Sequence, residues 1–261
     1  MQIPYFHVDA FTSGIFGGNP AGVCRLERWL PDEVLQRIAR ENNLSETAFY
    51  VRKEDGGYDL RWFTPETEVD LCGHATLATA HVLWKHSGEV LETLAFATKS
   101  GPLTVKREGE RLALDFPARP AQPAKMPADA AQAFSAEPLS CSKARDYLFE
   151  FRDEDEVRQL KPDFARLMGW EGLGVIVTAP GREVDFVSRF FAPKAGLNED
   201  PVTGSSHCTL IPFWAERLGK NVLQARQVSA RGGELFCEML GDRVKIAGQA
   251  VTYLRGVIEV W

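Results

Sequence analysis

The sequence predicts an α+β protein made of two similar halves, each a mostly antiparallel sheet curled around a buried helix. Two observations lead to this prediction. Two stretches of the chain recur at nearly one spacing, and each copy contains a helical segment without any charged residue. A helix that is apolar on all sides is buried on all sides. The short aromatic and β-branched runs in each half supply the strands that would surround it.

The internal repeat is visible in two pairs of segments. Residues 61–84 resemble residues 189–214, and residues 100–114 resemble residues 231–246 at an offset of 132 positions. Two stretches at nearly one spacing favour duplication over chance similarity. At an offset of 133 positions, the first pair of segments aligns the following residues: His74 with His207, Thr76 with Thr209, and Leu77 with Leu210.

A run rich in Pro and Ala follows the first half and predicts the domain boundary. Its prolines interrupt both helix and strand, and it has no hydrophobic periodicity. We therefore expect an N-terminal domain over residues 1–117, a linker over residues 118–131, and a C-terminal domain over residues 132–261. The sequence leaves open whether the final strand, at residues 250–261, returns to the first domain.

The predicted helices differ in character. Residues 31–42 form an amphipathic helix with Pro31 in its first turn. Residues 75–84 and 205–215 carry no charge and are the two central helices, although Pro212 must lie near a first turn or produce a kink. Residues 107–111 form a hairpin turn with Gly109 at the positive-φ position.

Composition narrows the function class. The chain has 261 residues, a net charge of −6 and a pI of about 5.5, which disfavours nucleic acid and anionic membranes as partners. No signal peptide or membrane span is expected. The five cysteines are widely spaced, as in a reducing compartment, so we expect a cytoplasmic protein. No metal is expected, because the His and Cys spacings fit no zinc motif.

Chemistry is expected where the two uncharged helices begin. One begins at Cys72-Gly73-His74, and the other follows the segment 200–206, Asp-Pro-Val-Thr-Gly-Ser-Ser. A helix N-terminus exposes free N–H groups with a partial positive charge and is suited to a carboxylate. Two such ends could face each other across a cleft between the domains. Ordinary helix caps and tight turns would produce the same spacing. The spacing alone therefore does not distinguish an anion-binding site from a structural turn.

Four motifs together resemble the phenazine-biosynthesis PhzF-like isomerase family, over most of the chain. They lie at residues 17–23 (GGNPAGV), 45–49 (SETAF), 63–78 and 198–207 (NEDPVTGSSH). The resemblance implies the diaminopimelate epimerase-type fold, with two pseudo-symmetric barrels, each around a central helix, and a site between them. It further implies a cofactor-independent isomerase that moves a proton on a small carboxylic acid, and a homodimer.

The resemblance also implies residue roles. Glu46 falls on the catalytic glutamate, and partial desolvation at the start of an apolar strand would favour its use as a general base. His74 and Asp200 are the other catalytic candidates, and the substrate-binding candidates are Gly73, Ala75, Gly204 and Ser205. From the residues alone, a solvated strand end is the favoured interpretation of Glu46, a turn residue explains Asp200 as well as catalysis does, and His74 can be a helix cap.

Two alternatives stay open on the sequence. In related amino-acid epimerases two cysteines act as opposed acid and base, and Cys72 occupies the first of those positions while Thr203 occupies the second. Because a neutral hydroxyl is a poor acid and base, a two-thiol racemase is disfavoured, but an epimerase or dehydratase using Cys72 and Thr203 remains an alternative. The other alternative is a non-catalytic protein that binds small carboxylates. Nothing in the motifs names the substrate.

Overall fold

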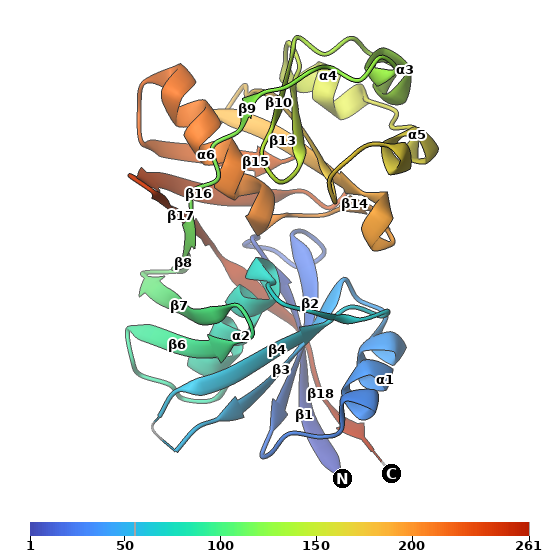
Figure 1. The fold of residues 1–261 in the computed structure, drawn as a ribbon. Helices are drawn as coiled ribbons and strands as arrows, with labels where there is room; N and C mark the ends of the chain where they lie inside the picture. Colours follow the sequence, from blue (N-terminus) through green and yellow to red (C-terminus); the bar gives the residue numbers. More distant parts are fainter. Residues whose placement is uncertain (55, 261) are drawn as a thin grey trace. The chain divides into compact units, whose positions relative to one another are not determined.

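The computed structural model describes residues 1–54 and 56–260, which form two compact units (Figure 1). Unit 1 is Met1–Asp115 together with the segment that begins at Ala247, and unit 2 is Phe116–Ile246. None of the described helices is long and apolar enough to cross a membrane.

Unit 1 contains two helices and a sheet that is mostly antiparallel. Its elements are β1 (Gln2–Ala10), β2 (Asn19–Leu26), α1 (Asp32–Asn42), β3 (Glu46–Arg52), β4 (Tyr58–Phe63), β5 (Glu68–Val69), α2 (Gly73–His86), β6 (Thr93–Thr98), β7 (Gly101–Glu108), β8 (Arg111–Pro117) and β18 (Ala250–Glu259).

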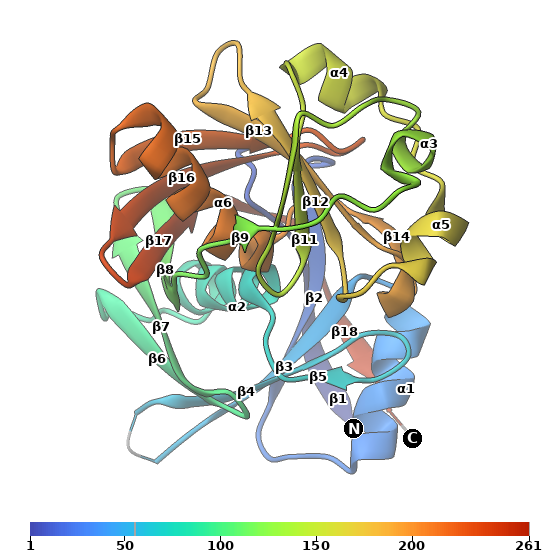
Figure 2. The same ribbon diagram turned by 45° about the horizontal axis from the view of Figure 1, so that its top comes forward.

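Both ends of the chain contribute to unit 1. Strand β18 pairs antiparallel with β1, from Gln2↔Glu259 to Ala10↔Ala250. The amino group and carbonyl of Met1 exchange hydrogen bonds of 2.6 and 2.9 Å with the backbone of Val260, and the two termini lie side by side in Figures 1 and 2. The final strand is therefore part of the first half.

Amphipathic helix α1 covers one part of this sheet. It follows Pro31, ends at Asn43 in the left-handed conformation, and buries Leu35 and Ile38 against the sheet residue Phe49. The hairpin between β7 and β8 turns at Gly109, whose φ is +65°. Both features agree with the sequence prediction.

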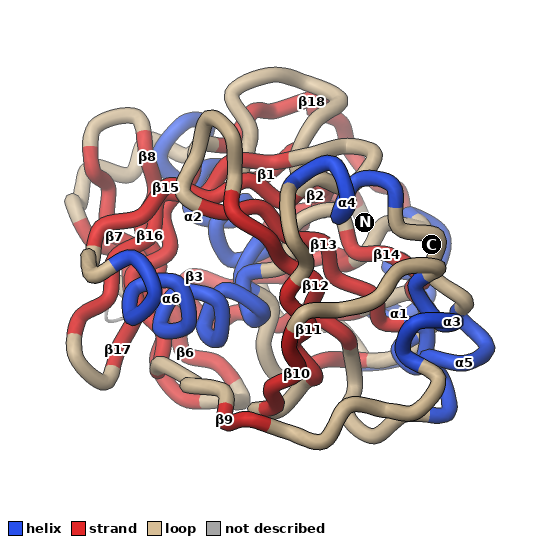
Figure 3. Tube along the Cα trace, turned by 90° about the horizontal axis from the view of Figure 1, so that it is seen from above, coloured by secondary structure: helices blue, strands red, loops and turns tan. Residues whose placement is uncertain are grey.

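Unit 2 repeats this plan with additional short helices. Its elements are β9 (Gln122–Pro123), α3 (Ala130–Phe134), β10 (Ser140–Lys143), β11 (Tyr147–Glu150), α4 (Glu154–Gln159), α5 (Phe164–Gly169), β12 (Val175–Pro180), β13 (Phe186–Ala192), a 3-10 turn (Pro193–Ala195), β14 (Leu197–Asp200), α6 (Gly204–Leu218), β15 (Val222–Gln227), β16 (Gly233–Leu240) and β17 (Arg243–Gly248). Figure 3 shows α3 and α5 side by side at one end of the unit.

Strand pairing supports the duplication directly. In unit 1, β2–β3 is parallel, β3–β4 antiparallel, β4–β6 parallel and β6–β7 antiparallel. In unit 2, β11–β12, β12–β13, β13–β15 and β15–β16 repeat that order of parallel and antiparallel pairs. Each unit places one helix between the third and fourth of these paired strands, α2 between β4 and β6 and α6 between β13 and β15. The predicted fold class is confirmed.

The two central helices are buried, as their lack of charge predicted. Helix α2 packs on β1, β2, β3 and β18, and α6 packs on β15 and β16. Pro212 lies inside α6 and has no N–H to donate to the carbonyl of Cys208 four residues earlier. The backbone N–H of Arg119 donates to that carbonyl instead, at 2.8 Å. The helix therefore continues through its proline without an unsatisfied carbonyl there.

The helix starts correct one detail of the sequence repeat. Gly73 begins α2 and Gly204 begins α6, which lie 131 positions apart rather than 133. His207 therefore occupies the position of Thr76, not that of His74. Both side chains bond the carbonyl of the residue that precedes the helix: the Thr76 hydroxyl donates to Cys72, and His207 Nδ1 lies 2.8 Å from the Thr203 oxygen. The sequence match between the two histidines was wrong in register.

Residues 118–131, expected as a linker, carry regular structure within unit 2. Gln122 and Pro123 form β9, which pairs with β10, and the N–H of Ala124 donates to the carbonyl of Cys141. Ala130 begins α3. The prolines shorten these elements rather than removing them.

Candidate active site

The carboxylate expected to act as the base lies at the start of β3. Glu46 is the first residue of the strand and pairs in parallel register with Ala21 of β2. The following side chains, Ala48 to Tyr50, are buried, which fixes the strand in place. The side chain of Glu46 is 19% exposed, so it is partly desolvated but reachable from solvent.

Helix α2 begins beside it with an extended residue. Cys72 precedes the helix with φ −145° and ψ 108°, and its side chain forms no capping hydrogen bond. The first N–H groups of a helix have no intrahelical partner. Gly73, His74 and Ala75 therefore present backbone donors, at the positive end of the helix dipole, where an anion is stabilised.

Three side chains meet at this helix start. His74 Nε2 lies 3.1 Å from Glu46 Oε2, and the imidazole side chain is only 6% exposed. The thiol of Cys72 lies 3.6 Å from His74 Nδ1 and 4.0 Å from Nε2. The structure thus brings Glu46, Cys72 and His74 into one cluster, although Glu46 is more than twenty residues away in the sequence.

Charge within the cluster follows from burial and proximity. Burial, reinforced by the nearby Glu46 carboxylate, raises the pKa of the Cys72 thiol to about 11, so this thiol is protonated at neutral pH. Burial by itself would lower the pKa of His74, but its interactions with the Cys72 and Glu46 side chains outweigh this and raise that pKa well above its usual value.

The sequence reasoning did not single out Asn19, which orients the histidine. The side-chain amide of Asn19 is fully buried and lies 3.2 Å from His74 Nδ1. Gly18 places it there: its φ is +63°, and a Cβ at this position would lie 2.1 Å from the carbonyl oxygen of Ala10. Asn19 belongs to the GGNPAGV motif, so the signal was present, but only the fold shows that it contacts His74.

Helix α6 of unit 2 begins in the same backbone geometry with different chemistry. Thr203 precedes the helix with φ −114° and ψ 103°. Its hydroxyl donates to the Asp200 carboxylate. Gln227, which is fully buried, accepts from the Thr203 N–H at 2.9 Å and donates to the Asp200 carbonyl at 2.7 Å. Asp200 and Thr203 are therefore held in a closed hydrogen-bonded turn.

Two further residues complete that helix start. Arg145 Nη2 donates to the Ser205 hydroxyl at 3.2 Å, while the same guanidinium pairs with Asp146. Burial lowers the pKa of His207 to about 4, so its imidazole is neutral at pH 7. Arg145 and Gln227 were not predicted from the sequence, because neither lies in a recognisable motif.

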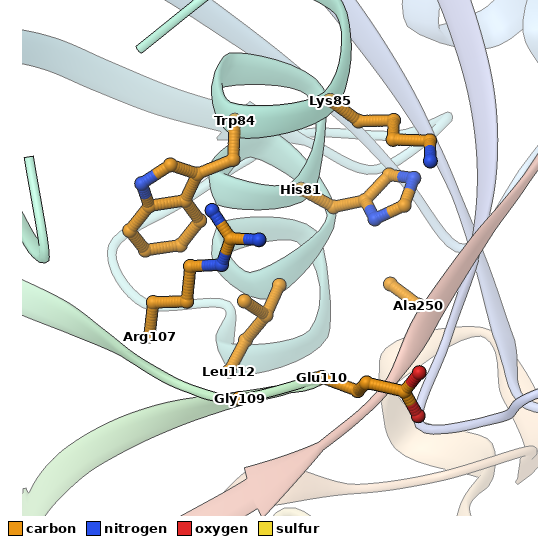
Figure 4. Close-up of a pocket in the computed structure, with 8 residues that line it drawn as sticks. All are labelled: His81, Trp84, Lys85, Arg107, Gly109, Glu110, Leu112 and Ala250. Carbon is orange, nitrogen blue, oxygen red and sulfur yellow. The ribbon is translucent and has the colours of Figure 1, made fainter. Parts of the chain in front are cut away.

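A separate pocket of about 120 Å³ lies at the other end of α2 (Figure 4). The helix has 14 residues and is about 20 Å long, so this pocket is distinct from the cluster around His74. It contains none of the predicted site residues. Its lining residues are His81, Trp84, Lys85, Arg107, Gly109, Glu110, Leu112 and Ala250.

The repeated fold and the cluster of Glu46 with His74 define a class of protein. Comparison of the sequence with known families identifies that class. The model of the PhzC-PhzF family, described as phenazine biosynthesis-like protein, matches residues 8–256. The chain belongs to this family, which confirms the resemblance seen in the four motifs. It is an isomerase of the PhzF type, as the sequence predicted.

Individual relatives cover the whole chain. An uncharacterized isomerase of Pseudomonas aeruginosa is 52% identical over 260 residues, covering 100% of both chains. The crystal structure of a PhzF-family protein from Enterococcus faecalis matches with a TM-score of 0.98 and 49% identity, again over 100% of both chains. A hydroxyproline epimerase from Agrobacterium vitis, at 8% identity and a TM-score of 0.62 over 98% of this chain and 92% of its own, shares the fold alone.

Proposed function

We propose that the protein isomerises a small carboxylic acid, resembling an amino or hydroxy acid, by moving a proton with Glu46. The observation that carries this proposal is the 3.1 Å contact between Glu46 Oε2 and His74 Nε2 beside the first N–H groups of α2. A group to accept a proton, a group to orient it and a helix start to hold an anion are thereby present in one cluster.

The proton transfer follows from this arrangement. The Glu46 carboxylate removes a proton from a carbon next to a carboxylate or double bond, and the C–H electron pair moves into that acceptor. The protonated Glu46 then returns the proton to another carbon on the same face of the substrate. The N–H groups of Gly73, His74 and Ala75 stabilise the negative charge that develops on the acid in between.

His74 serves the base rather than replacing it. The imidazole nitrogen 3.1 Å from Glu46 Oε2 fixes the position of the carboxylate, which is the group that accepts a proton. Asn19 holds the ring from its other nitrogen. We assign His74 to orientation of Glu46 and to hydrogen bonding of the substrate.

Unit 2 is proposed to contribute binding groups. Gly204 and Ser205 offer the N–H groups of a second helix start, and the Ser205 hydroxyl adds a polar contact. Asp200 is engaged with Thr203, so we assign it to shaping this turn. The homodimer, the cytoplasmic location and the position of the substrate between the two domains remain predictions.

The alternative that uses Cys72 and Thr203 as opposed acid and base has less support. The Cys72 thiol holds its proton at neutral pH, and the Thr203 hydroxyl is committed to Asp200. Inversion needs a competent group on each face of the substrate, and this pair supplies none at neutral pH.

Proton exchange with solvent tests the proposal. The purified protein is incubated in deuterated water with a panel of amino and hydroxy acids, and loss of C–H signals is followed by NMR. We expect exchange of at least one acid with the wild type and a loss of about 100-fold or more in Glu46→Gln. Glu41→Gln, an exposed change on α1, is the matched control and should exchange at the wild-type rate. Equal exchange in Glu46→Gln and wild type would refute the assignment.

A further inference from the structure

The cluster at the start of α2 has a second chemical property. A carboxylate, a thiol and an imidazole, from Glu46, Cys72 and His74, place their ligand atoms within 4.8 Å of one another. Within residues 1–54 and 56–260 this is the one group of three such side chains that meets that distance. These are the three donor types that Zn²⁺ accepts in proteins.

The separations are close to those of a zinc site. With bonds of about 2.0–2.3 Å and tetrahedral angles, ligand atoms around Zn²⁺ lie roughly 3.3–3.6 Å apart. Here His74 Nε2 lies 3.1 Å from Glu46 Oε2 and 4.0 Å from the Cys72 sulfur. A side-chain rotation that brings the Cys72 sulfur closer to His74 Nε2 is needed to complete the geometry.

The surroundings also favour an ion with three protein ligands. Glu46 is the most exposed of the three side chains, so an ion can enter from its side and keep a solvent molecule as fourth ligand, as in zinc sites with an open position. Metal-binding histidines usually have their second nitrogen held by an outer partner. The Asn19 amide nitrogen lies 3.2 Å from His74 Nδ1, and turning the amide so that its oxygen faces the ring lets it accept the Nδ1–H of a zinc-bound imidazole.

We propose that Glu46, Cys72 and His74 bind Zn²⁺ reversibly, and that the bound ion inhibits the isomerase. The sulfur binds as thiolate and the imidazole through Nε2, so the protons on these atoms pass to solvent as the ion enters. The inhibition part rests on the proposed function, because a Glu46 carboxylate bound to Zn²⁺ is no longer free to accept a substrate proton. The binding part is independent of it.

Co²⁺ titration tests the binding part without any substrate. Tetrahedral Co²⁺ bound to a thiolate gives a sulfur-to-metal charge-transfer band in the near ultraviolet, and Zn²⁺ should remove this band by displacement. We expect one ion per chain. Cys72→Ala and Cys72→Ser should both lose the band, and the affinity for Zn²⁺ should fall by more than the roughly 10- to 100-fold typical of losing an outer-shell partner.

Two variants serve as matched controls. Cys141→Ala removes another cysteine, and His86→Gln breaks the pair formed by His81 and His86, which both contact the Thr252 hydroxyl. Both controls should retain the band and the wild-type affinity. Absence of Zn²⁺ binding at a large molar excess, or a band that persists in folded Cys72→Ala, would overturn the site.

Activity separates the two proposals. Zn²⁺ should abolish C–H exchange by the wild type, and a chelator should restore it. Zn²⁺ that binds in a Cys72-dependent manner while exchange continues would overturn the inhibition. Cys72-dependent binding in a protein that exchanges no acid would leave the zinc site standing and count against the proposed function alone.

Discussion

The starts of α2 and α6 share a backbone but differ in chemistry. Both helices follow an extended residue whose side chain forms no cap, and both begin at glycine. At α2 the neighbours are titratable, with the partly exposed Glu46 against the buried His74. At α6 the corresponding turn is closed by neutral hydrogen bonds through Gln227, and its histidine is neutral. The duplicated element thus keeps its backbone form in both copies, whereas the proposed proton-transfer groups lie beside one of them.

The largest effect on C–H exchange is expected when the two carboxylates near these helix starts are substituted and compared. Glu46→Gln should lower C–H exchange by about 100-fold or more, whereas Asp200→Asn should lower it by less than about tenfold, because Asn retains one acceptor for the Thr203 hydroxyl. Exchange rates measured by NMR on the two variants in parallel check this. A larger loss of exchange in Asp200→Asn than in Glu46→Gln would indicate that the proton-transfer group lies in unit 2.

The next largest effect is on the pH dependence of stability. It depends on His207, whose pKa is shifted in the opposite direction to that of His74. The pKa of His207 is lowered to about 4 in the folded protein, so the unfolded chain binds a proton that the folded chain does not as pH falls below about 6.5. The neutral imidazole of His207 therefore makes its full contribution to the free energy of unfolding above that pH. This contribution falls by up to about 3 kcal/mol as the pH drops from about 6.5 to 4.

Denaturant unfolding at pH 7 and at pH 4.5 measures this contribution. His207→Gln should show a smaller loss of unfolding free energy between the two pH values than the wild type. His86→Gln, at a histidine that is not fully buried, should change the loss less. An unchanged pH dependence in His207→Gln would show that this buried imidazole does not govern the acid lability.

A smaller effect is expected when the same substitution is made at the two histidines and activity is measured. His74→Gln should lower exchange by about 10- to 100-fold, because Gln does not reproduce the imidazole contact that holds Glu46 in place. His207→Gln should lower it by less than about threefold at pH 7. Equal losses would indicate that the histidines act through stability, which the thermal midpoints of both variants would reveal.

The smallest effect is expected at Cys72. Because its thiol is protonated at neutral pH, Cys72→Ala should change exchange by less than about threefold. Iodoacetamide should label Cys72 slowly at pH 7, as read by mass spectrometry, since the thiolate is the reactive form. Loss of activity in Cys72→Ala, together with protection of Cys72 by substrate, would instead favour the epimerase alternative.

Much of the fold could be predicted because its strongest signals are local. The uncharged segments of α2 and α6, the amphipathic α1 and the turn at Gly109 all follow from residue patterns within a few turns of chain. The register of the repeat could not be predicted in this way. The identical residues His74 and His207 suggested one alignment of the two halves, whereas the helix starts define another. The elements within residues 118–131 were missed because short strands and helices there are stabilised by pairing and burial rather than by propensity.

The candidate site was predictable only where a motif carried it. Glu46, His74 and Cys72 lie in motifs, and the structure brings them together. Asn19 lies in a motif as well, but its contact with His74 depends on the fold around Gly18. Gln227 ends an ordinary strand and Arg145 lies in a loop, so their hydrogen bonds to residues 200–205 are properties of the tertiary structure. The roles assigned to these residues remain predictions.

The pairing of β18 with β1 has a consequence for biogenesis. Unit 2 is continuous in sequence, whereas unit 1 needs strand β18, which is synthesised after all of unit 2. Contacts between distant parts of a chain form late, because the intervening loop must first close. We therefore expect unit 2 to fold first during synthesis, while the unit that carries Glu46 waits for β18.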